Sequence, residues 1–158
     1  MAEAMSTQDA AYATFLGFDF GEKKTGVAVG QRITGTARAL ETIRSHTPEV
    51  LWRGVGRLVD AWEPVAFVVG VPFPIVETTE KNPVIDLIKT FCRDLERRYQ
   101  RPVHIMDEAL STRESQTLFY TQGHRKSVAF RDVKDEIAAQ LILQTWLDHT
   151  APRGSLDD

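Results

Sequence analysis

The chain has 158 residues, of which 42% are hydrophobic and 26% are charged, and its formal net charge is -3 at pH 7. This length suits one domain that buries about two-thirds of its unfolded surface. No apolar run approaches the roughly 20 residues of a membrane span, so the sequence excludes a membrane protein. The negative net charge excludes a general nucleic-acid coat protein, whose whole surface would be basic.

The two ends of the chain predict no packed structure. Residues 1–13 lack the basic segment and apolar core of a secretory signal. We expect residues 1–13 and 150–158 to be flexible tails on a single domain that spans 14–149. The one cysteine, Cys92, excludes an internal disulfide and fits a reducing cytoplasm, where we expect the protein to be located.

Three strands in meander order are predicted at the start of the domain. They are short apolar or β-branched runs bounded by turn residues, at 15–20, 26–29 and 36–42. The polar turn at 21–24 joins the first two strands as a β-hairpin. Asp19 therefore stands at the end of the first strand, between two phenylalanines.

Helices and strands alternate in the rest of the chain. Thr47 before Pro48 is typical of a helix start, and Pro64 ends that helix. The later elements are a buried strand at 65–70, a helix from Asn82-Pro83 to Tyr99, a strand at 103–107, a helix at 111–122 and a last helix that Asp132 opens. This order predicts an α/β fold with a mixed sheet and helices on its faces.

Three acids are candidates for one site. A buried carboxylate without a partner costs several kcal/mol, so Asp19 inside its apolar strand needs a cation. Glu108 follows the end of a later strand, and Asp135 lies in the first turn of the last helix. Ligands in open α/β sheets gather at the carboxyl ends of strands, which would bring these residues together.

Carboxylates in this number suit Mg²⁺ or Mn²⁺, which take oxygen ligands. Two such ions about 3.5 to 4 Å apart can activate a water and stabilise the leaving oxygen of a phosphodiester. Each acid also has a purely structural interpretation, as a turn anchor for Asp19, a surface acid for Glu108 and a helix cap for Asp135. Asp107 and Glu136 are interpreted as bystanders, and the scattered histidines predict no zinc site.

Basic residues are concentrated near these acids in the sequence. Residues 22–57 hold seven Lys or Arg against three acids. These cations can be a solvated surface or a phosphate-binding rim around an acidic centre. The candidates for contact with nucleic acid are Lys23, Lys24, Arg32, Arg125, Lys126 and Lys134.

Four blocks of sequence, in chain order, resemble the YqgF (RuvX-like) family: FDFGEKKTGVAVGQRITGTARAL, VVGVP, DEALSTRES and DEIAAQLIL. The resemblance covers residues 15–147. Members of this family have an RNase H-like fold and are named as Holliday junction resolvases and as pre-16S rRNA nucleases. The resemblance implies an RNase H-like α/β fold, with a five-stranded mixed sheet whose first three strands are antiparallel and whose faces carry helices.

The resemblance also implies roles for the three acids. Asp19 matches the first-strand Asp of the family, Glu108 the Glu of its DER-L-[ST] motif, and Asp135 the Asp that begins its last helix. It implies a metal-dependent endonuclease in which Asp19 bridges two Mg²⁺ or Mn²⁺ ions and the other two acids hold one each. The chain departs from the family at Ala109, which replaces the Arg of the motif, and in the loop FPIVETTE at 73–80.

The implied substrate is structured nucleic acid, first of all the 5′ end of pre-16S rRNA in ribosome biogenesis, with the ribosome as a further partner. Two alternatives are a resolvase acting on four-way DNA junctions and a nucleic-acid-binding module with weak catalysis. Resolvases act as symmetric dimers, so a homodimer would favour the first alternative and a monomer RNA processing. The hairpin also resembles that of actin-like ATPases, but those proteins need two such domains.

Overall fold

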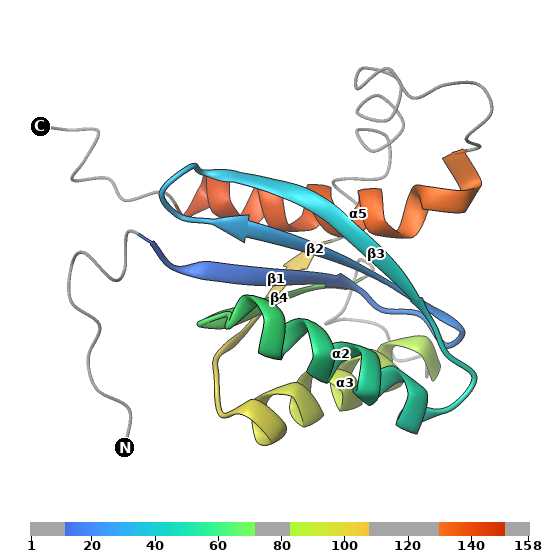
Figure 1. Cartoon of the computed structure of the whole chain (residues 1–158). Coiled ribbons are helices and arrows are strands. Elements are labelled where there is room, and N and C mark those ends of the chain that lie inside the picture. The colour runs from blue at the N-terminus through green and yellow to red at the C-terminus, as the bar shows by residue number, and fades with distance from the viewer. Residues whose placement is uncertain (1–11, 72–82, 108–129, 151–158) are drawn as a thin grey trace, which may run out of the picture.

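A computed structural model describes residues 12–71, 83–107 and 130–150 of the chain (Figure 1). The predicted helix at 111–122 and most of the two predicted tails lie outside these ranges. Within them, no helix is long and apolar enough to cross a membrane.

A five-stranded mixed sheet forms the centre of the molecule. Its strands are β1 (Thr14–Asp19), β2 (Lys24–Gln31), β3 (Thr36–Arg44), β4 (Ala66–Val71) and β5 (Val103–Asp107), in the spatial order β3-β2-β1-β4-β5. The first three strands pair antiparallel, and β4 runs parallel to both β1 and β5. The predicted sheet is therefore confirmed, with β1 in its middle.

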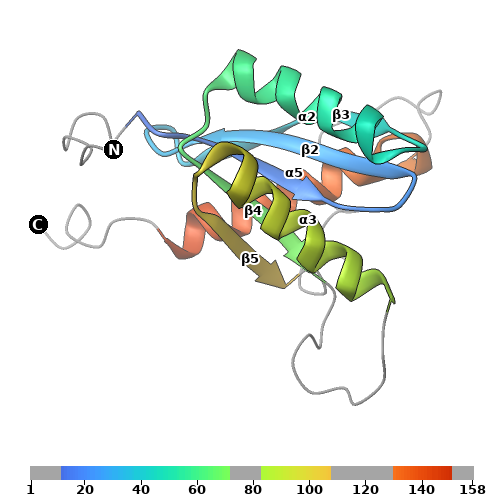
Figure 2. The same cartoon turned by 90° about the horizontal axis from the view of Figure 1, so that it is seen from below.

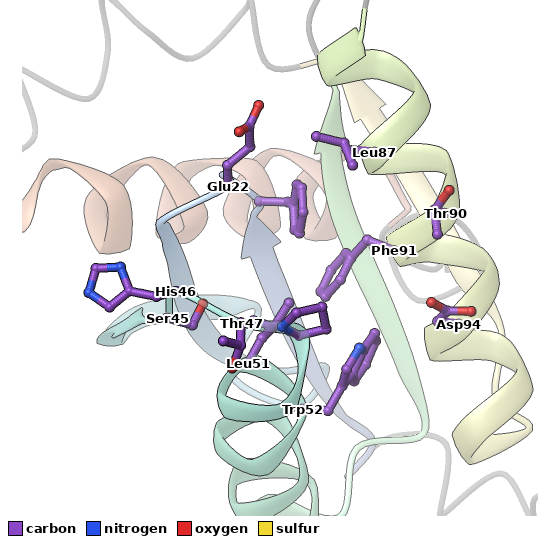
Figure 3. Close-up of a pocket in the computed structure, with 12 residues that line it drawn as sticks. Glu22, Ser45, His46, Thr47, Leu51, Trp52, Leu87, Thr90, Phe91 and Asp94 are labelled. Atoms are coloured by element: carbon purple, nitrogen blue, oxygen red, sulfur yellow. The ribbon is translucent and has the colours of Figure 1, made fainter.

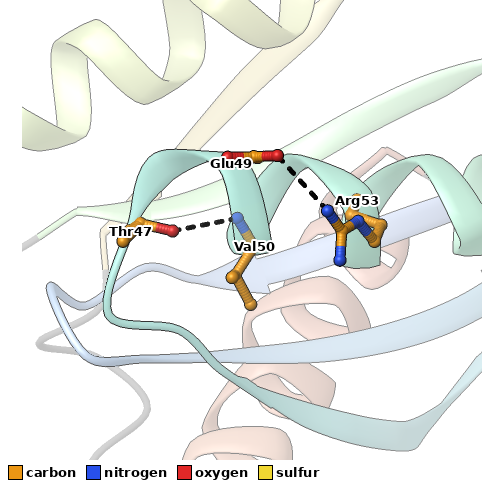
Figure 4. Close-up of polar contacts among 4 residues, drawn as sticks. All are labelled: Thr47, Glu49, Val50 and Arg53. Atoms are coloured by element: carbon orange, nitrogen blue, oxygen red, sulfur yellow. Dashed lines mark hydrogen bonds and ion pairs between the residues drawn. The ribbon is translucent and has the colours of Figure 1, made fainter.

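Helices cover both faces of the sheet. They are α2 (Pro48–Trp62), α3 (Pro83–Tyr99) and α5 (Phe130–His149). Helices α2 and α3 lie together on one face, and α5 crosses the other (Figures 1 and 2). The predicted start of α2 is confirmed, because the Thr47 hydroxyl accepts a hydrogen bond of 3.2 Å from the Val50 N–H (Figure 4).

The predicted start of the last helix at Asp132 is wrong. Helix α5 begins at Phe130, so Asp132 is inside the helix and Asp135 lies in its second turn. Acids three residues apart also occur inside the first turns of a helix, because the positive end of the helix dipole favours acids there. Such a pattern locates a helix end only to within one or two residues.

The two faces of the sheet carry side chains of different size. The face under α2 and α3 has large residues, among them Leu16, Phe18, Val27 and Phe67. The face under α5 has Phe15 and Val68 but also many small residues, which are Gly17, Gly26, Ala28, Gly30 and Gly70. A Cβ atom added at Gly17 would lie 2.8 Å from the Leu143 Cβ. The helix α5 therefore packs closer to the sheet than any side chain larger than Gly would permit at these contacts.

Two glutamines fix α5 against the edge strand β3. The Gln144 amide accepts a hydrogen bond of 2.9 Å from the Ala37 N–H and donates one of 2.8 Å to the Gly35 carbonyl. Buried Gln140 donates to the Ala37 carbonyl over 3.1 Å. These bonds satisfy backbone groups that an edge strand otherwise leaves unpaired, and they set the position of α5 along the strands.

Candidate active site

Asp19 is the last residue of the central strand and belongs to a row of three paired residues across the sheet. Its Cα partner on β2 is Gly26, and the partner of Gly26 on β3 is Thr42. Directly opposed residues of antiparallel strands project to the same face. The side chains of Asp19 and Thr42 therefore project toward α5. The Asp19 side chain is partly buried.

Helix α5 meets this row at Gly26. A Cβ atom added at Gly26 would overlap the carbonyl group of Asp135 and would lie 2.7 Å from the Glu136 nitrogen. Opposed Cα atoms of antiparallel strands are about 4.5 to 5.5 Å apart, so the backbone of Asp135 lies beside the direct neighbour of Asp19. The structure thus places two of the three predicted acids at the same edge of the sheet.

The third predicted acid cannot be placed, because Glu108 lies outside the described residues. In the described ranges, no group of three or more His, Cys, Asp and Glu side chains could hold a metal ion. Asp107 ends β5 opposite Val71, and the preceding Met106 packs against the core under α5. Alternation along the strand therefore directs Asp107 to the other face of the sheet from Asp19.

Glu136 was interpreted as a bystander and lies over β3. Burial, the largest effect, raises the pKa of its carboxyl group, and the negative charges of Glu41 and Asp135 raise it further. The Thr42 hydroxyl and the Arg44 charge lower it. The buried Thr42 oxygen makes no hydrogen bond of normal geometry within the described residues, although it is near enough to the Glu136 carboxyl group to affect its pKa.

Arg44 is a residue that the sequence interpretation did not single out. It is the Cα partner of Lys24, two positions along both strands from the row of Gly26 and Thr42. Lys24 and Arg44 therefore project to the same face as that row. Both are exposed, so two cations lie beside the acids at this edge. Counting every second residue from Thr42 would have found Arg44, but only once the register of β3 was known.

The other predicted basic contacts are divided between the two ends of the sheet. Lys23 is exposed in the hairpin turn next to Asp19, and its carbonyl accepts a hydrogen bond of 2.9 Å from the Ser45 N–H. Lys134 is exposed on α5, directly before Asp135. Arg125 and Lys126 lie outside the described residues.

Arg32 lies at the opposite end of the sheet from Asp19, since β2 ends beside the first residue of β1. Its guanidinium carbon is 5.2 Å from the ring centroid of Phe15 and 5.3 Å from that of Trp146. Its Nη1 donates to the Leu147 carbonyl over 3.4 Å, and burial lowers its pKa. These contacts stabilise the C-terminal end of α5 and leave Arg32 away from the acidic edge.

The hairpin turn after Asp19 is held by two residues. The Thr25 hydroxyl donates to the Gly21 carbonyl over 3.4 Å. A Cβ atom at Gly21 would lie 2.5 Å from the Lys24 carbonyl oxygen, so the close approach of backbone to backbone in this turn requires glycine. The absence of a side chain at Gly21 therefore lets the turn close directly after the end of β1.

Comparisons of sequence show which proteins this chain is similar to. The family model described as "RuvX: Holliday junction resolvase" matches residues 13–149. A protein of Methylococcus capsulatus is 50% identical over 147 residues, which are 92% of this chain and 96% of that protein. Relatives in Legionella pneumophila and Ralstonia nicotianae are 37% and 41% identical and cover 86% and 88% of this chain and 96% and 89% of their own. All three are named "Putative pre-16S rRNA nuclease".

Solved structures resemble the fold at much lower sequence identity. The Thermus thermophilus RuvC structure with a Holliday junction substrate has a TM-score of 0.55 at 14% identity, and covers 89% of this chain and 98% of that one. The fowlpox virus resolvase with Holliday junction DNA has a TM-score of 0.58 at 12% identity, and covers 88% and 99%. At such identities the likeness shows the fold alone, and it confirms the predicted RNase H-like fold.

Proposed function

Because the chain belongs to the RuvX family and is therefore a hydrolase of the nuclease class, we propose that it processes the 5′ end of pre-16S rRNA in the cytoplasm, using divalent metal ions. The observation that carries the proposal is the contact of α5 with Gly26, which brings Asp135 to the row that contains Asp19. The backbones of two acids from distant parts of the chain lie close together there, at the carboxyl end of the central strand, which supports the proposal.

The donor set at this edge fits Mg²⁺ or Mn²⁺. Asp19 and Asp135 supply carboxylate oxygens, which such hard cations prefer over nitrogen or sulfur ligands. We propose that they hold the ions together with Glu108, with Asp19 shared between two ions. Bound ions would supply an activated water and neutralise charge at the reacting phosphodiester. The protein contributes the fixed separation of strand and helix that holds the acids in place.

The exposed cations beside the acids suit the backbone of a nucleic acid. Lys24 and Arg44 are opposed on β2 and β3, and Lys23 and Lys134 extend the basic surface into the hairpin turn and onto α5. Contacts to phosphate position a substrate but do not read its sequence. We propose that these four residues hold the strand whose phosphodiester lies at the acidic edge, and that Arg32 takes no part.

RNA is favoured over a four-way DNA junction as the substrate. The support for RNA is the name of relatives that are up to 50% identical over nearly the whole chain. The support for a junction is the description of the family model and a fold shared at 12% to 14% identity with resolvases. Junction resolution is therefore the second candidate, and a dimer in solution would favour it because the junction has two-fold symmetry.

The proposed function is tested by cleavage of a precursor 16S rRNA fragment and of a four-way DNA junction, each with Mg²⁺, with Mn²⁺ and with EDTA. We expect metal-dependent cleavage of the RNA and its loss in Asp19→Asn and in Asp135→Asn. Asp60→Asn, which removes an exposed acid on α2, is the matched control and should cleave like the wild type.

Cleavage of the junction alone would replace the first candidate with the second. If the wild type left both substrates intact with either metal, the nuclease proposal would be refuted for this chain. Isothermal titration of Mn²⁺ into the wild type and Asp135→Asn separates loss of metal binding from loss of a later step. We expect the Asp135 variant to bind the metal more weakly.

A further inference from the structure

A cavity of about 290 Å³ lies on the face of the sheet opposite α5, near the site but separate from its acids. It is bounded by the first turns of α2, by one side of α3 and by the start of the β1–β2 turn (Figure 3). The residues that matter for its chemistry are Phe20, Glu22, Trp52, Thr90, Phe91 and Asp94. The active site described above does not use this cavity.

Three aromatic rings form one wall of the cavity. The Phe20 and Phe91 rings have centroids 4.8 Å apart and planes at 31°, and those of Trp52 and Phe91 are 5.3 Å apart at 25°. Arg98 lies over Trp52, with its guanidinium carbon 4.4 Å from the ring centroid. Trp52 is stacked on Phe91, and Phe20 is tilted against it. Because Phe91 is buried and Phe20 is only partly buried, a further flat ring can extend this row by stacking on Phe20.

The charged groups that line the cavity beside its rings are carboxylates, and its other polar groups are hydroxyls and the His46 ring. Glu22 and Asp94 line it, and the carboxylate of Asp94 makes no hydrogen bond or ion pair with any side chain in the described part of the chain. Two carboxylates repel a phosphate. They attract a neutral, flat group that carries N–H donors, and a nucleobase with an exocyclic amino group has that chemistry.

The cavity adjoins the acidic edge through the chain itself. Phe20 directly follows Asp19, so their Cα atoms are about 3.8 Å apart, and alternation directs the two side chains to opposite faces of the sheet. A strand whose phosphodiester lies at Asp19 can therefore pass over the end of β1 and place a neighbouring base on the other face. Such a base must be unpaired, because a base inside a duplex is stacked between its neighbours and cannot turn its face to a protein ring.

We propose that this cavity binds one unpaired, amino-bearing base of the substrate next to the cleaved phosphodiester, stacked on Phe20. This inference rests on the proposed function, since it takes the substrate to be a nucleic acid held at Asp19. Stacking of a base on aromatic side chains corresponds to about 5- to 150-fold in affinity. Loss of the ring at Phe20 should weaken binding within that range.

The test uses single-stranded RNA oligonucleotides in EDTA, so that binding is measured without cleavage. A series in which each position in turn is abasic is titrated against the full chain. We expect one position at which the missing base weakens binding at least 5-fold to the wild type and to Phe20→Tyr. The same abasic position should have no effect on Phe20→Leu, because that variant has already lost the stacking surface.

Two further measurements separate the cavity from the rest of the surface. Quenching of tryptophan fluorescence by the intact oligonucleotide should be smaller in Trp52→Phe. Asp94→Ala should reduce the preference for cytosine or adenine over uracil at the sensitive position. Equal weakening at every abasic position, or the same sensitive position in Phe20→Leu, would overturn the inference.

Failure of the two proposals gives different results. If no substrate is cleaved but one abasic position is sensitive and depends on Phe20, the cavity binds a base and the nuclease proposal fails. If RNA is cleaved through Asp19 and no single position is sensitive, the nuclease proposal stands and the base-binding cavity is refuted.

Discussion

Replacing Gly26 with alanine should damage the active site without changing any acid. The added methyl group would overlap the Asp135 carbonyl and lie 2.7 Å from the Glu136 nitrogen. Side-chain carbons do not approach other heavy atoms to less than about 3 Å, so the backbone of α5 must withdraw by about 1 Å. Overpacking of this kind costs about 1 to 3 kcal/mol. A misplacement of about 1 Å at a catalytic site can cost roughly 100-fold in rate.

The assay is metal-dependent cleavage of the precursor rRNA fragment, read beside thermal unfolding. For Gly26→Ala we expect the melting temperature to fall by about 2 to 4 °C for each kcal/mol lost, and the rate to fall by about 100-fold while the protein is still folded. Gly56→Ala is the matched control, because its Cβ would lie 3.4 Å from the Tyr99 hydroxyl, an ordinary contact. A folded Gly26→Ala protein with the wild-type rate would refute the argument that this contact positions Asp135.

Three further predictions concern residues away from the acids. Thr47→Ala removes the N-cap of α2 and should lower the free energy of unfolding, measured with denaturant, by about 1 kcal/mol. Arg53→Ala breaks an exposed ion pair with Glu49 (Figure 4) and should change that free energy by less than about 0.5 kcal/mol. Equal effects of the two substitutions would contradict the role of the cap. Arg32→Met should lower the melting temperature but leave the salt dependence of RNA binding unchanged, and a shallower salt slope would restore Arg32 to the nucleic-acid surface. Burial raises the pKa of the Cys92 thiol to about 11, so the neutral thiol dominates at pH 8 and only about one in a thousand is ionised; alkylation of the native protein should therefore be far slower than in urea and rise with pH, and equal rates in both states would exclude a buried thiol.

The sequence predicted the sheet well because its strands differ from their surroundings in simple ways. The run at β4 is almost wholly apolar, as a strand covered on both faces must be. Thr47 followed by Pro48 is typical of a helix start, with Thr as N-cap and Pro at the first helical position. The position of Asp19 at a strand end followed from the same local patterns. These features depend on residues that are neighbours in the chain, so a single sequence is enough to predict them.

Features that depend on register were not predictable in the same way. The opposition of Lys24 and Arg44 requires the pairing of β2 with β3, and a register shift between Val27 and Ala28 interrupts simple counting along that pair. Arg32 was predicted as a nucleic-acid contact because it belongs to the basic stretch at 22–57. Its packing against Trp146, more than a hundred residues away, is a tertiary contact that composition does not reveal.

The contact that matters most for the site was present in the sequence as a pattern of volume rather than of polarity. Along β2, Gly26, Ala28 and Gly30 alternate with Val27 and Val29, and every one of them is apolar. An analysis of polar against apolar residues treats this strand as uniform and expects both faces to be covered at equal distance. Alternation in size instead lets α5 approach one face more closely than α2 and α3 approach the other. The distance of Asp135 from Asp19 is therefore set by missing side-chain volume on β2, so substitutions that add volume there should act on the site even where they leave every charge in place.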